Sequence, residues 1–538
     1  MSTPKSRGPR ALGRTPLFRT VIRALREAKL RGAHPGREEA AARLGGASSR
    51  REFLGRSVKA AAALPFLARA AAAAQDRNDG VPGSAQAPVA ILGGGAAGLT
   101  AAYRLAKANV PCSLFEGSER LGGRIFTRRD FNKDGMFCEL GAELVDSNHE
   151  ELIGLARELG IEVQELRDGD PGVDFYFFDG EHRTGKDLIP AFEPLAKQLV
   201  EDAEGLEGED GSYTEKARRL DLMSLEEYLD SRKKDVAKWV LELIRIAYVG
   251  EYGLEAGEQS AMNLISYIDP DTSNGFRLFG DSDASKRIRG GNSTLTEALA
   301  GAIRDRVPVH VGHRLVRVRD AGNEIELTFE VSRRSVSLRF SRVLFTIPFT
   351  VLRHVEGIFD LDLSPVKKVC IRSLGYGTNV KVMYGFRERF WRRVETGGHK
   401  SNGSIYCDLP GQCFWETSRG QGGLSGILTN FLGGLAGSAF HPNRLDETLV
   451  ELDRMLPGVK GYYDGQKTMM NWPIFQFSKG SYSCPRVGQV TSILEAARAP
   501  ELQGRLLFAG EHTSLDFGGF MNGAIQSGNR AAGEILAG

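Results

Sequence analysis

The sequence predicts an α/β protein in which a discontinuous dinucleotide-binding domain is combined with a second domain of mixed sheet and helices. Three observations support this fold class. The chain has 538 residues, which is too many for a single hydrophobic core. Residues 89–116 follow the order strand, glycine-rich turn, helix and strand, and residues 506–536 contain a second strand–turn–helix pattern. The composition, with 41% hydrophobic and 26% charged residues, is typical of a soluble globular protein.

The first pattern centres on the stretch ILGGGAAGL. The apolar run Val89–Leu92 predicts a buried strand, and a helix is expected over residues 99–108. The spacing G-x-G-x-x-G between them lets the backbone approach a pyrophosphate at the helix N-terminus, where free N–H groups favour an anion. The next strand, Cys112–Phe115, ends in Glu116, which is placed to accept a ribose hydroxyl. The residues expected to contact the dinucleotide in this turn are Gly93, Gly95, Ala97 and Gly98.

Two further motifs favour FAD over NAD as the dinucleotide. Gly122 and Gly123 with Arg124 provide two more close backbone approaches, which a longer cofactor can use. Near the C-terminus, Gly510 and Glu511 follow a strand, and a helix is expected to begin close to Met521. Such a helix can direct its N–H groups at the flavin ring, and its dipole would stabilise negative charge on reduced flavin.

With these motifs, residues 88–538 resemble the flavin amine oxidase family, which includes monoamine, polyamine and L-amino acid oxidases and histone lysine demethylases. The resemblance implies that Gly141, Ala142 and Glu143 form a turn near the flavin and that Val316 contacts the adenine. It also implies that the backbone of Met521 faces the ring. Ser481 stands where monoamine oxidases have the cysteine that is joined to flavin, so we expect non-covalent FAD.

The resemblance also implies the domain organisation. The FAD-binding domain is expected in three segments, residues 85–149, 286–348 and 476–538. The substrate domain is expected to have a helical part at 150–285 and a sheet part at 349–475. Residues 307–318, 324–331 and 335–345 alternate or run apolar, which predicts the strands of a small sheet.

Four residues are candidates for the reaction itself. Lys381 lies nine residues before Phe390-Trp391, as in the family, where such a lysine holds a water near flavin N5 and assists reoxidation by oxygen. Trp472 and Tyr482 are ten residues apart, the spacing found in monoamine oxidases, and Phe520 takes the place of a second tyrosine. Two aromatic faces can hold an amine by cation–π contact and orient it.

The substrate-binding residues are less sharply defined. Asp146 aligns with an acidic residue that some polyamine oxidases place in the substrate tunnel, where a carboxylate can pair with a distal ammonium. It could equally be a solvated turn residue. Several amino acid oxidases have an arginine for the substrate carboxylate where this chain has Leu144, which disfavours an amino acid substrate.

These residues predict oxidation of a primary or secondary amine to an imine and then an aldehyde or ketone, with oxygen reduced to hydrogen peroxide. Three alternatives remain at this stage. An L-amino acid oxidase on the same fold needs a carboxylate-binding arginine, and a flavin desaturase or protoporphyrinogen-type oxidase need not have Lys381 or the aromatic pair. A scaffold that retains FAD without turnover is a third. No metal is expected, since none of the six cysteines forms a C-x-x-C pair.

The N-terminal segment, residues 1–74, has the character of a targeting signal. It contains 16 Lys or Arg against 4 Asp or Glu, so in a chain of net charge +2 the remaining residues carry −10. That acidic body argues against nucleic acid as a partner. Arg50-Arg51 precedes an alanine-rich apolar run that ends in Ala72-Ala73-Ala74, which resembles a twin-arginine export signal. We expect the twin-arginine export machinery as a partner, a periplasmic or extracytoplasmic location, and no stable membrane span in the mature protein.

Overall fold

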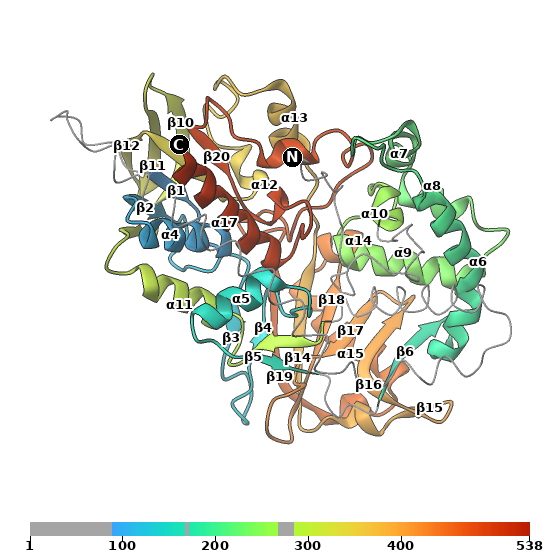
Figure 1. Ribbon diagram of the computed structural model, residues 1–538. Coiled ribbons are helices and arrows are strands. Elements are labelled where there is room, and N and C mark those ends of the chain that lie inside the picture. The colour runs from blue at the N-terminus through green and yellow to red at the C-terminus, as the bar shows by residue number, and fades with distance from the viewer. Residues whose placement is uncertain (1–88, 167–171, 267–283) are drawn as a thin grey trace, which may run out of the picture.

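The computed structural model of the protein describes residues 89–166, 172–266 and 284–538 (Figure 1). The expected export signal therefore lies outside the described residues. Within them, two large sheets are the main structural elements, one of five strands and one of eight. No helix in these three ranges is long and apolar enough to cross a membrane.

The five-stranded sheet is entirely parallel and forms the dinucleotide-binding core. Its strand order is β20 (Leu506–Phe508), β13 (Arg342–Phe345), β1 (Val89–Leu92), β2 (Cys112–Phe115) and β9 (Val309–His310). Three stretches far apart in the sequence thus form one sheet, as the discontinuous domain predicts. The strand β1 lies at its centre with all four residues buried, as expected for a parallel strand covered on both faces.

Different elements pack on the two faces of this sheet. Successive side chains along a strand point to opposite faces, so neighbouring residues join different hydrophobic clusters. Ile91 and Leu114 pack with the helices on one face, whereas Ala90 and Phe115 pack with the opposite layer. The helices of the first face are α4 (Ala96–Lys107), α5 (Glu150–Glu158), α11 (Ser293–Ile303) and α17 (Met521–Ala537). Figure 1 shows α4 and α17 side by side beneath β1. The opposite layer contains α12 (Phe349–Leu352), α13 (Pro365–Ser373), α16 (Leu494–Arg498) and a small three-stranded sheet.

The small sheet differs from the sequence prediction at both ends. Its strands are β10 (Arg314–Asp320), β11 (Ile325–Val331) and β12 (Arg334–Phe340), all antiparallel. The predicted strand 307–318 is in fact two strands, β9 in the parallel sheet and β10 in the small one. The predicted strand 335–345 is also two strands, because the chain leaves β12 and enters the parallel sheet as β13 (Arg342–Phe345). Buried side chains of residues 349–376 also pack on this layer, so the first part of the segment expected in the substrate domain lies against the dinucleotide-binding sheet.

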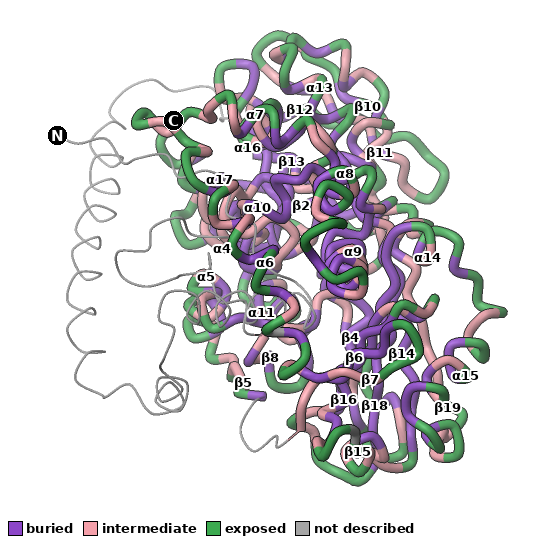
Figure 2. Tube along the Cα trace, turned by 90° about the vertical axis from the view of Figure 1, so that its right-hand side faces the viewer, coloured by how far each residue is buried: buried purple, intermediate pink, exposed green. Residues whose placement is uncertain are grey.

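The second large sheet is mixed. Its order is β19 (Tyr463–Asn471), β14 (Val380–Phe386), β18 (Gly426–Leu432), β17 (Cys413–Glu416), β16 (His399–Cys407), β6 (Val173–Phe178) and β7 (Glu181–Arg183), with β15 (Glu395–Thr396) paired to β16. Only the β16–β6 pair is parallel. The expected helical part, 150–285, therefore also supplies two strands to the substrate sheet. All seven residues of β14 are buried, and Figure 2 shows the buried tube through β14, β18 and β6.

Helices cover both faces of this sheet. On one face lie α6 (Gly185–Ala203), α7 (Glu215–Asp221), α8 (Leu225–Asp230), α9 (Lys238–Tyr252) and α10 (Met262–Ile265). On the other lies α15 (Leu445–Met455), which packs on Val380 and Val382. The remaining short elements are β3 (Thr127–Arg128), β4 (Cys138–Glu139), β5 (Val163–Glu165), β8 (Lys286–Ile288), α14 (Gly434–Ser438) and the 3-10 turns Phe390–Arg393, Pro442–Arg444, Val459–Tyr462 and Glu511–Thr513.

Candidate active site

A cavity of about 1820 Å³, measured with its open mouth, extends from the five-stranded sheet to the substrate sheet. Most of the residues predicted from the sequence line it, although they come from segments hundreds of residues apart. They are Gly93, Gly95, Ala97, Glu116, Gly122, Gly123, Arg124, Gly141, Ala142, Glu143, Lys381, Trp472, Tyr482, Gly510, Glu511, Phe520 and Met521. Gly98, Val316 and Asp146 lie outside this lining.

The glycines of the first turn have separate physical roles. A Cβ on Gly95 would meet nothing within 4 Å, so this residue leaves open space at the N-terminus of α4 for a ligand. A Cβ on Gly98 would lie 2.0 Å from the carbonyl oxygen of Gly93, so this residue permits close packing of helix and turn. Helix α4 has no side-chain cap, and its first residues Ala96 and Ala97 line the cavity. Free N–H groups at this end favour a phosphate.

Glu116 is held in a fixed position at the end of β2. Its carboxylate accepts hydrogen bonds from the N–H groups of Gly94 and Ser118, both at 2.8 Å. The side chain is 8% exposed and lines the cavity. Two bonds leave acceptor positions on the carboxylate for hydroxyl groups of a ligand. The geometry therefore suits the ribose contact that the motif predicts.

Arg124 and Glu511 form an ion pair across the cavity wall. The guanidinium lies 2.8 Å from Glu511 Oε1 and also donates to the carbonyl of Ser481. Glu511 further accepts hydrogen bonds from both the N–H and the hydroxyl of Ser483. Burial alone would raise the pKa of Glu511, but Arg124 and these donors lower it to about 2. The pair joins the segments around residues 124, 483 and 511 at one point.

The C-terminal helix begins at the cavity. Phe520 precedes the first turn of α17 without a side-chain cap, and Phe520, Met521 and Ala524 line the cavity. The free N–H groups of this turn and the helix dipole place partial positive charge there. Two helix N-termini, those of α4 and α17, thus face the same cavity. One fits a pyrophosphate and the other a ring system that gains negative charge.

Lys381 is buried at the wall formed by the substrate sheet, with 3% of its surface exposed. Its Nζ donates to Glu143 Oε2 at 2.7 Å and to the carbonyl of Gly141 at 3.0 Å. An ammonium has three N–H donors, so one remains for a ligand or water in the cavity. Burial would raise the pKa of Glu143, but the Lys381 charge and hydrogen bonds from Lys381 and Thr417 hold it below its usual value.

Three predicted aromatic residues, Trp472, Tyr482 and Phe520, also line the cavity. Trp472 donates its indole N–H to the carbonyl of Leu140 at 3.1 Å, and the Tyr482 hydroxyl donates to the carbonyl of Gly250 at 3.2 Å. Phe520 packs against the ring of His149, with centroids 5.1 Å apart. These contacts fix the ring positions, so the lining next to Lys381 is rigid and largely aromatic.

Two sequence-predicted contacts are placed elsewhere. Val316 lies at an irregularity in the pairing of β10 with β11, and Leu315 lines the cavity instead. A bulge changes which side chain faces inward, so the side chain of Leu315 borders the cavity, and the adenine contact of Val316 stays a prediction. Asp146 is buried in a second layer, where it accepts from the N–H of Ala284 at 2.6 Å and lies 3.4 Å from His149 Nε2.

Several lining residues were missed from the sequence. Trp415 and Phe431 come from β17 and β18, and Thr417 lies just behind them with its hydroxyl 2.7 Å from Glu143 Oε1. Their strands carry no motif, and alternation alone does not reveal which face borders a cavity. Only the pairing of β14 with β18, which sets Lys381 opposite Phe431, brings them to the site.

The family assignment agrees with this geometry. The sequence profile of flavin containing amine oxidoreductases matches residues 96–536, and the chain belongs to this family. The family description is that of flavin-containing oxidoreductases, and the α/β fold and the cavity agree with FAD as the cofactor. The residues fit FAD: Gly95 leaves open space that would take a phosphate, Glu116 would accept a ribose hydroxyl, and the uncapped N-terminus of α17 lines the cavity where the ring would bind. Residue 481 is a serine, so that position provides no thiol for a covalent bond.

Relatives and solved structures define what the chain is similar to. The lysine-specific histone demethylase 1 homolog 2 of Oryza sativa subsp. japonica is 28% identical over 468 residues, which cover 84% of this chain and 57% of that protein. The L-amino-acid oxidase of Mus musculus is 27% identical, over 83% of this chain and 70% of the mouse protein. Cyclohexylamine oxidase from Brevibacterium oxydans IH-35A has a TM-score of 0.71 at 20% identity, over 84% of this chain and 99% of that one. The last comparison establishes the fold.

Proposed function

We propose that the protein oxidises a small amine at the carbon next to nitrogen, giving an imine that water converts to an aldehyde or ketone. Oxygen is the proposed acceptor and hydrogen peroxide the second product, so two electrons leave the amine and two reach oxygen. FAD, when bound, supplies the two-electron acceptor for the amine. The observation that carries the proposal is the buried Lys381 beside the aromatic lining at the α17 end of the cavity.

The protein's part in this reaction is binding and orientation. Tyr482, Phe520 and Trp472 present aromatic surface that can hold an amine by cation–π and dispersion contacts. Because their positions are fixed by neighbouring groups, they restrict how the substrate approaches. Lys381 keeps one N–H donor for the cavity, which suits a bound water or oxygen. The cofactor contacts proposed are the lining residues that the sequence motifs predict, with Leu315 in place of Val316.

The charges of the lining favour an amine over an amino acid. Among the described residues, each lysine or arginine that lines the cavity already has a partner. Lys381 pairs with Glu143, Arg124 with Glu511 and Arg314 with Glu330, while Arg120 donates to three backbone carbonyls. An α-carboxylate needs a guanidinium fork that is free to receive it. The L-amino acid oxidase alternative therefore has less support, even though some relatives carry that name.

The site also argues for a monoamine rather than a diamine. The distal ammonium of a diamine requires a second carboxylate in the cavity, and Asp146 was the candidate. Asp146 is 2% exposed and bonded to Ala284 and His149 in the second layer. The lining near Lys381 is otherwise rich in aromatic side chains, including Trp415 and Phe431. We propose an apolar or aromatic monoamine as the substrate class.

We also propose export by the twin-arginine route to the periplasm or another extracytoplasmic location. This rests on Arg50-Arg51 and the alanine-rich run that follows. The same proposal makes the export machinery a partner of the precursor.

Anaerobic reduction of the bound FAD tests the function directly. The purified protein is mixed without oxygen with benzylamine, cyclohexylamine, putrescine, spermidine and several L-amino acids, and loss of the flavin absorbance is followed. Rapid loss with the monoamines is the expected result, with diamines slower by at least about tenfold, which corresponds to about 1.4 kcal/mol. Loss with amino acids only would refute the proposal, and no loss with any compound would favour a desaturase or a protein without turnover.

A further inference from the structure

The side chain that holds Lys381 is itself held at both oxygens. Glu143 accepts from Lys381 Nζ on Oε2 and from the Thr417 hydroxyl on Oε1, both at 2.7 Å. A carboxylate bonded at both oxygens has little freedom to rotate. Glu143 is 6% exposed, so water does not compete strongly for these bonds. The position of the ammonium therefore depends on the position of Thr417.

Thr417 is fixed in turn by the strand pairing. It follows directly on β17, and its N–H donates to the carbonyl of Ile427 at 2.9 Å, which continues the ladder with β18. Its hydroxyl lies 2.6 Å from that of Thr429, and its carbonyl accepts from Arg287 at 2.8 Å. Every polar atom of Thr417 is thus bonded, so its hydroxyl direction is determined.

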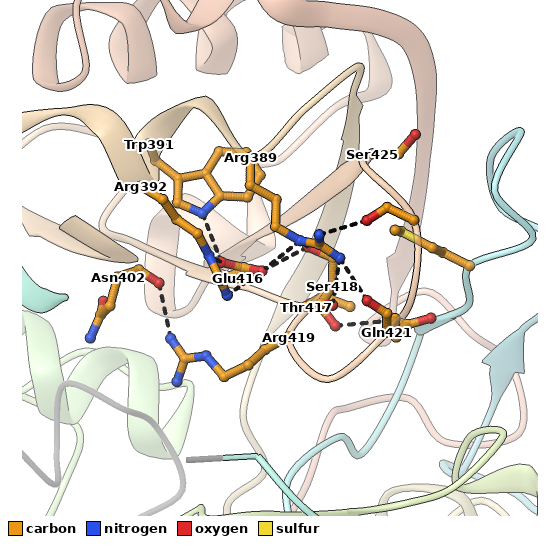
Figure 3. Close-up of polar contacts among 12 residues, drawn as sticks. Arg389, Trp391, Arg392, Asn402, Glu416, Thr417, Ser418, Arg419, Gln421 and Ser425 are labelled. Carbon is orange, nitrogen blue, oxygen red and sulfur yellow. Dashed lines mark hydrogen bonds and ion pairs between the residues drawn. The ribbon is translucent and has the colours of Figure 1, made fainter. Parts of the chain in front are cut away.

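The opposite face of this strand carries a buried charge cluster, shown in Figure 3. Side chains alternate along a strand, so Glu416 faces away from Trp415 and Thr417. Its carboxylate accepts from the Trp391 indole at 2.8 Å and from the Arg392 Nε at 2.8 Å, and Arg389 Nε lies 3.2 Å away. The Glu416 side chain is fully buried. The side chains of Arg389, Arg392 and Trp391 therefore hold Glu416, and with it the end of β17, in place.

Arg389 also contacts the loop that follows β17, and through this loop the dinucleotide-binding domain. It donates to the carbonyls of Gln421 and Gly423, at 2.8 and 2.9 Å. The Gln421 side chain exchanges two hydrogen bonds with the backbone of Phe137, both at 2.9 Å. Phe137 lies just before the segment that carries Gly141 and Glu143. Gly141 and Glu143, which accept from Lys381, and Thr417, which donates to Glu143, therefore lie on two chain segments that Gln421 and Phe137 join by hydrogen bonds.

We propose that Glu143 is the residue that positions Lys381 and balances its charge, with Thr417 fixing the orientation of the Glu143 carboxylate. The inference rests on the proposed role of Lys381. Removing one member of a buried ion pair leaves an uncompensated charge. The other charged groups near the pair are Arg287, which is buried behind Thr417, and Glu139, whose pKa burial raises to about 7. Without Glu143 the site near the cofactor is therefore more positive.

The test uses the FAD-loaded protein and two readouts, of which one is independent of turnover. Glu143→Gln keeps an acceptor for Lys381 and removes the charge. We expect the midpoint potential of bound FAD to shift to more positive values, because added positive charge favours the reduced, anionic cofactor. We also expect reoxidation by oxygen to slow, because the ammonium no longer has the charged partner that holds it in place.

Matched variants separate positioning from general damage. Thr417→Val removes the hydroxyl with little change in shape and should slow reoxidation at unchanged midpoint potential, while Thr417→Ser should restore the wild-type rate. Asp446→Asn removes the carboxylate, in α15, that pairs with Lys467 of β19 at 2.7 Å, and should alter neither readout. A wild-type midpoint potential together with a wild-type reoxidation rate in Glu143→Gln would overturn the proposal. If amines fail to reduce the FAD of the wild type but the midpoint potential still shifts in Glu143→Gln, the proposed function is wrong and the role of Glu143 in balancing the Lys381 charge is supported.

Discussion

At the scale of single residues, Lys381 is the side chain whose placement has the clearest chemical consequence. It is 3% exposed and keeps one N–H donor toward the cavity. A preorganised cation at that place favours the reaction of reduced flavin with oxygen, in which negative charge develops on oxygen. The same cation contributes little to removal of hydrogen from a neutral amine. The two half-reactions should therefore respond differently to its loss.

We predict that Lys381→Met slows reoxidation by oxygen about 100-fold, or about 3 kcal/mol of barrier, while reduction by amine changes much less. Stopped-flow absorbance in the two half-reactions measures both rates. Lys467→Met, on the adjacent strand β19 and 32% exposed in its side chain, is the control and should change neither. Equal slowing of both half-reactions would contradict a specific role in the oxygen reaction.

Glu511 links the cofactor site to stability at low pH. Its pKa is lowered to about 2 from 4.5, so the folded state favours the ionised form. A lowered pKa adds stability above pH 4.5 that is lost as the pH falls toward 2, by up to about 3 kcal/mol. We predict that the difference in urea midpoint between wild type and Glu511→Gln is large at pH 6 and shrinks between pH 4.5 and 2. A difference that stays constant with pH would show that the ionised form is not favoured.

Single residues also mark the limit of what the sequence predicts. The glycine motifs require particular backbone approaches, so Gly93, Gly95 and Gly123 could be assigned to the cavity without a structure. Val316 could not, because a bulge in β10 exchanges it with Leu315. Asp146 has the right residue type, but its side chain bonds to Ala284 and contacts His149, and it does not line the cavity. Such local irregularities do not change the hydrophobic periodicity of the sequence, so they could not be predicted from it.

At the scale of elements, the contact between α4 and α17 determines the position of both helix N-termini that face the cavity. A Cβ on Gly528 of α17 would lie 2.5 Å from the carbonyl oxygen of Ala97 in α4. Only glycine lets the helices approach so closely. We predict that Gly528→Ala lowers the free energy of unfolding by about 1–3 kcal/mol, the usual cost of overpacking, and weakens FAD binding. Thermal melting and release of FAD on dilution measure these effects.

Gly533 in the same helix provides the control. A Cβ at this position would meet nothing within 4 Å. Alanine is favoured over glycine in a helix interior by about 1 kcal/mol, so Gly533→Ala should leave FAD affinity unchanged and raise the melting temperature slightly. Normal stability and FAD affinity in Gly528→Ala would mean that the helices can separate without cost and that their spacing does not matter to the site.

Elements of strong local pattern were predicted well, and those defined by long-range pairing were not. The strands Val89–Leu92 and Cys112–Phe115 have the predicted bounds, and the C-terminal helix begins at Met521 as expected. The split of 335–345 into β12 and β13 was missed, since the two strands follow each other after one residue and belong to different sheets. Strand β6 was missed because its place in the sheet depends on β16, more than 200 residues away. Strand β7, which forms a short hairpin with β6 at the edge of the sheet, was missed with it.

At the scale of the whole molecule, the cofactor site requires the complete fold. The parallel sheet takes β1, β13 and β20 from three distant segments, and the cavity adds residues of the substrate sheet. FAD can therefore bind only after most of the chain has folded. The six cysteines are free and buried, so no disulfide links them. The proposed twin-arginine route carries chains that are already folded, which suits a cofactor site that requires the complete fold.

We predict that replacing Arg50-Arg51 by Lys-Lys blocks export while folding and FAD loading proceed normally. The protein should accumulate in the cytoplasm with its full flavin absorbance, since the replaced residues precede the folded domains. Flavin content of the cytoplasmic and periplasmic fractions measures this. Arg56→Lys, five residues further on, is the control and should be exported. Flavin-loaded Lys-Lys protein in the periplasm would contradict the twin-arginine route, whereas its absence from both fractions would point to a folding defect. Normal yield of the Arg56→Lys protein excludes a general effect of altering basic residues in this segment.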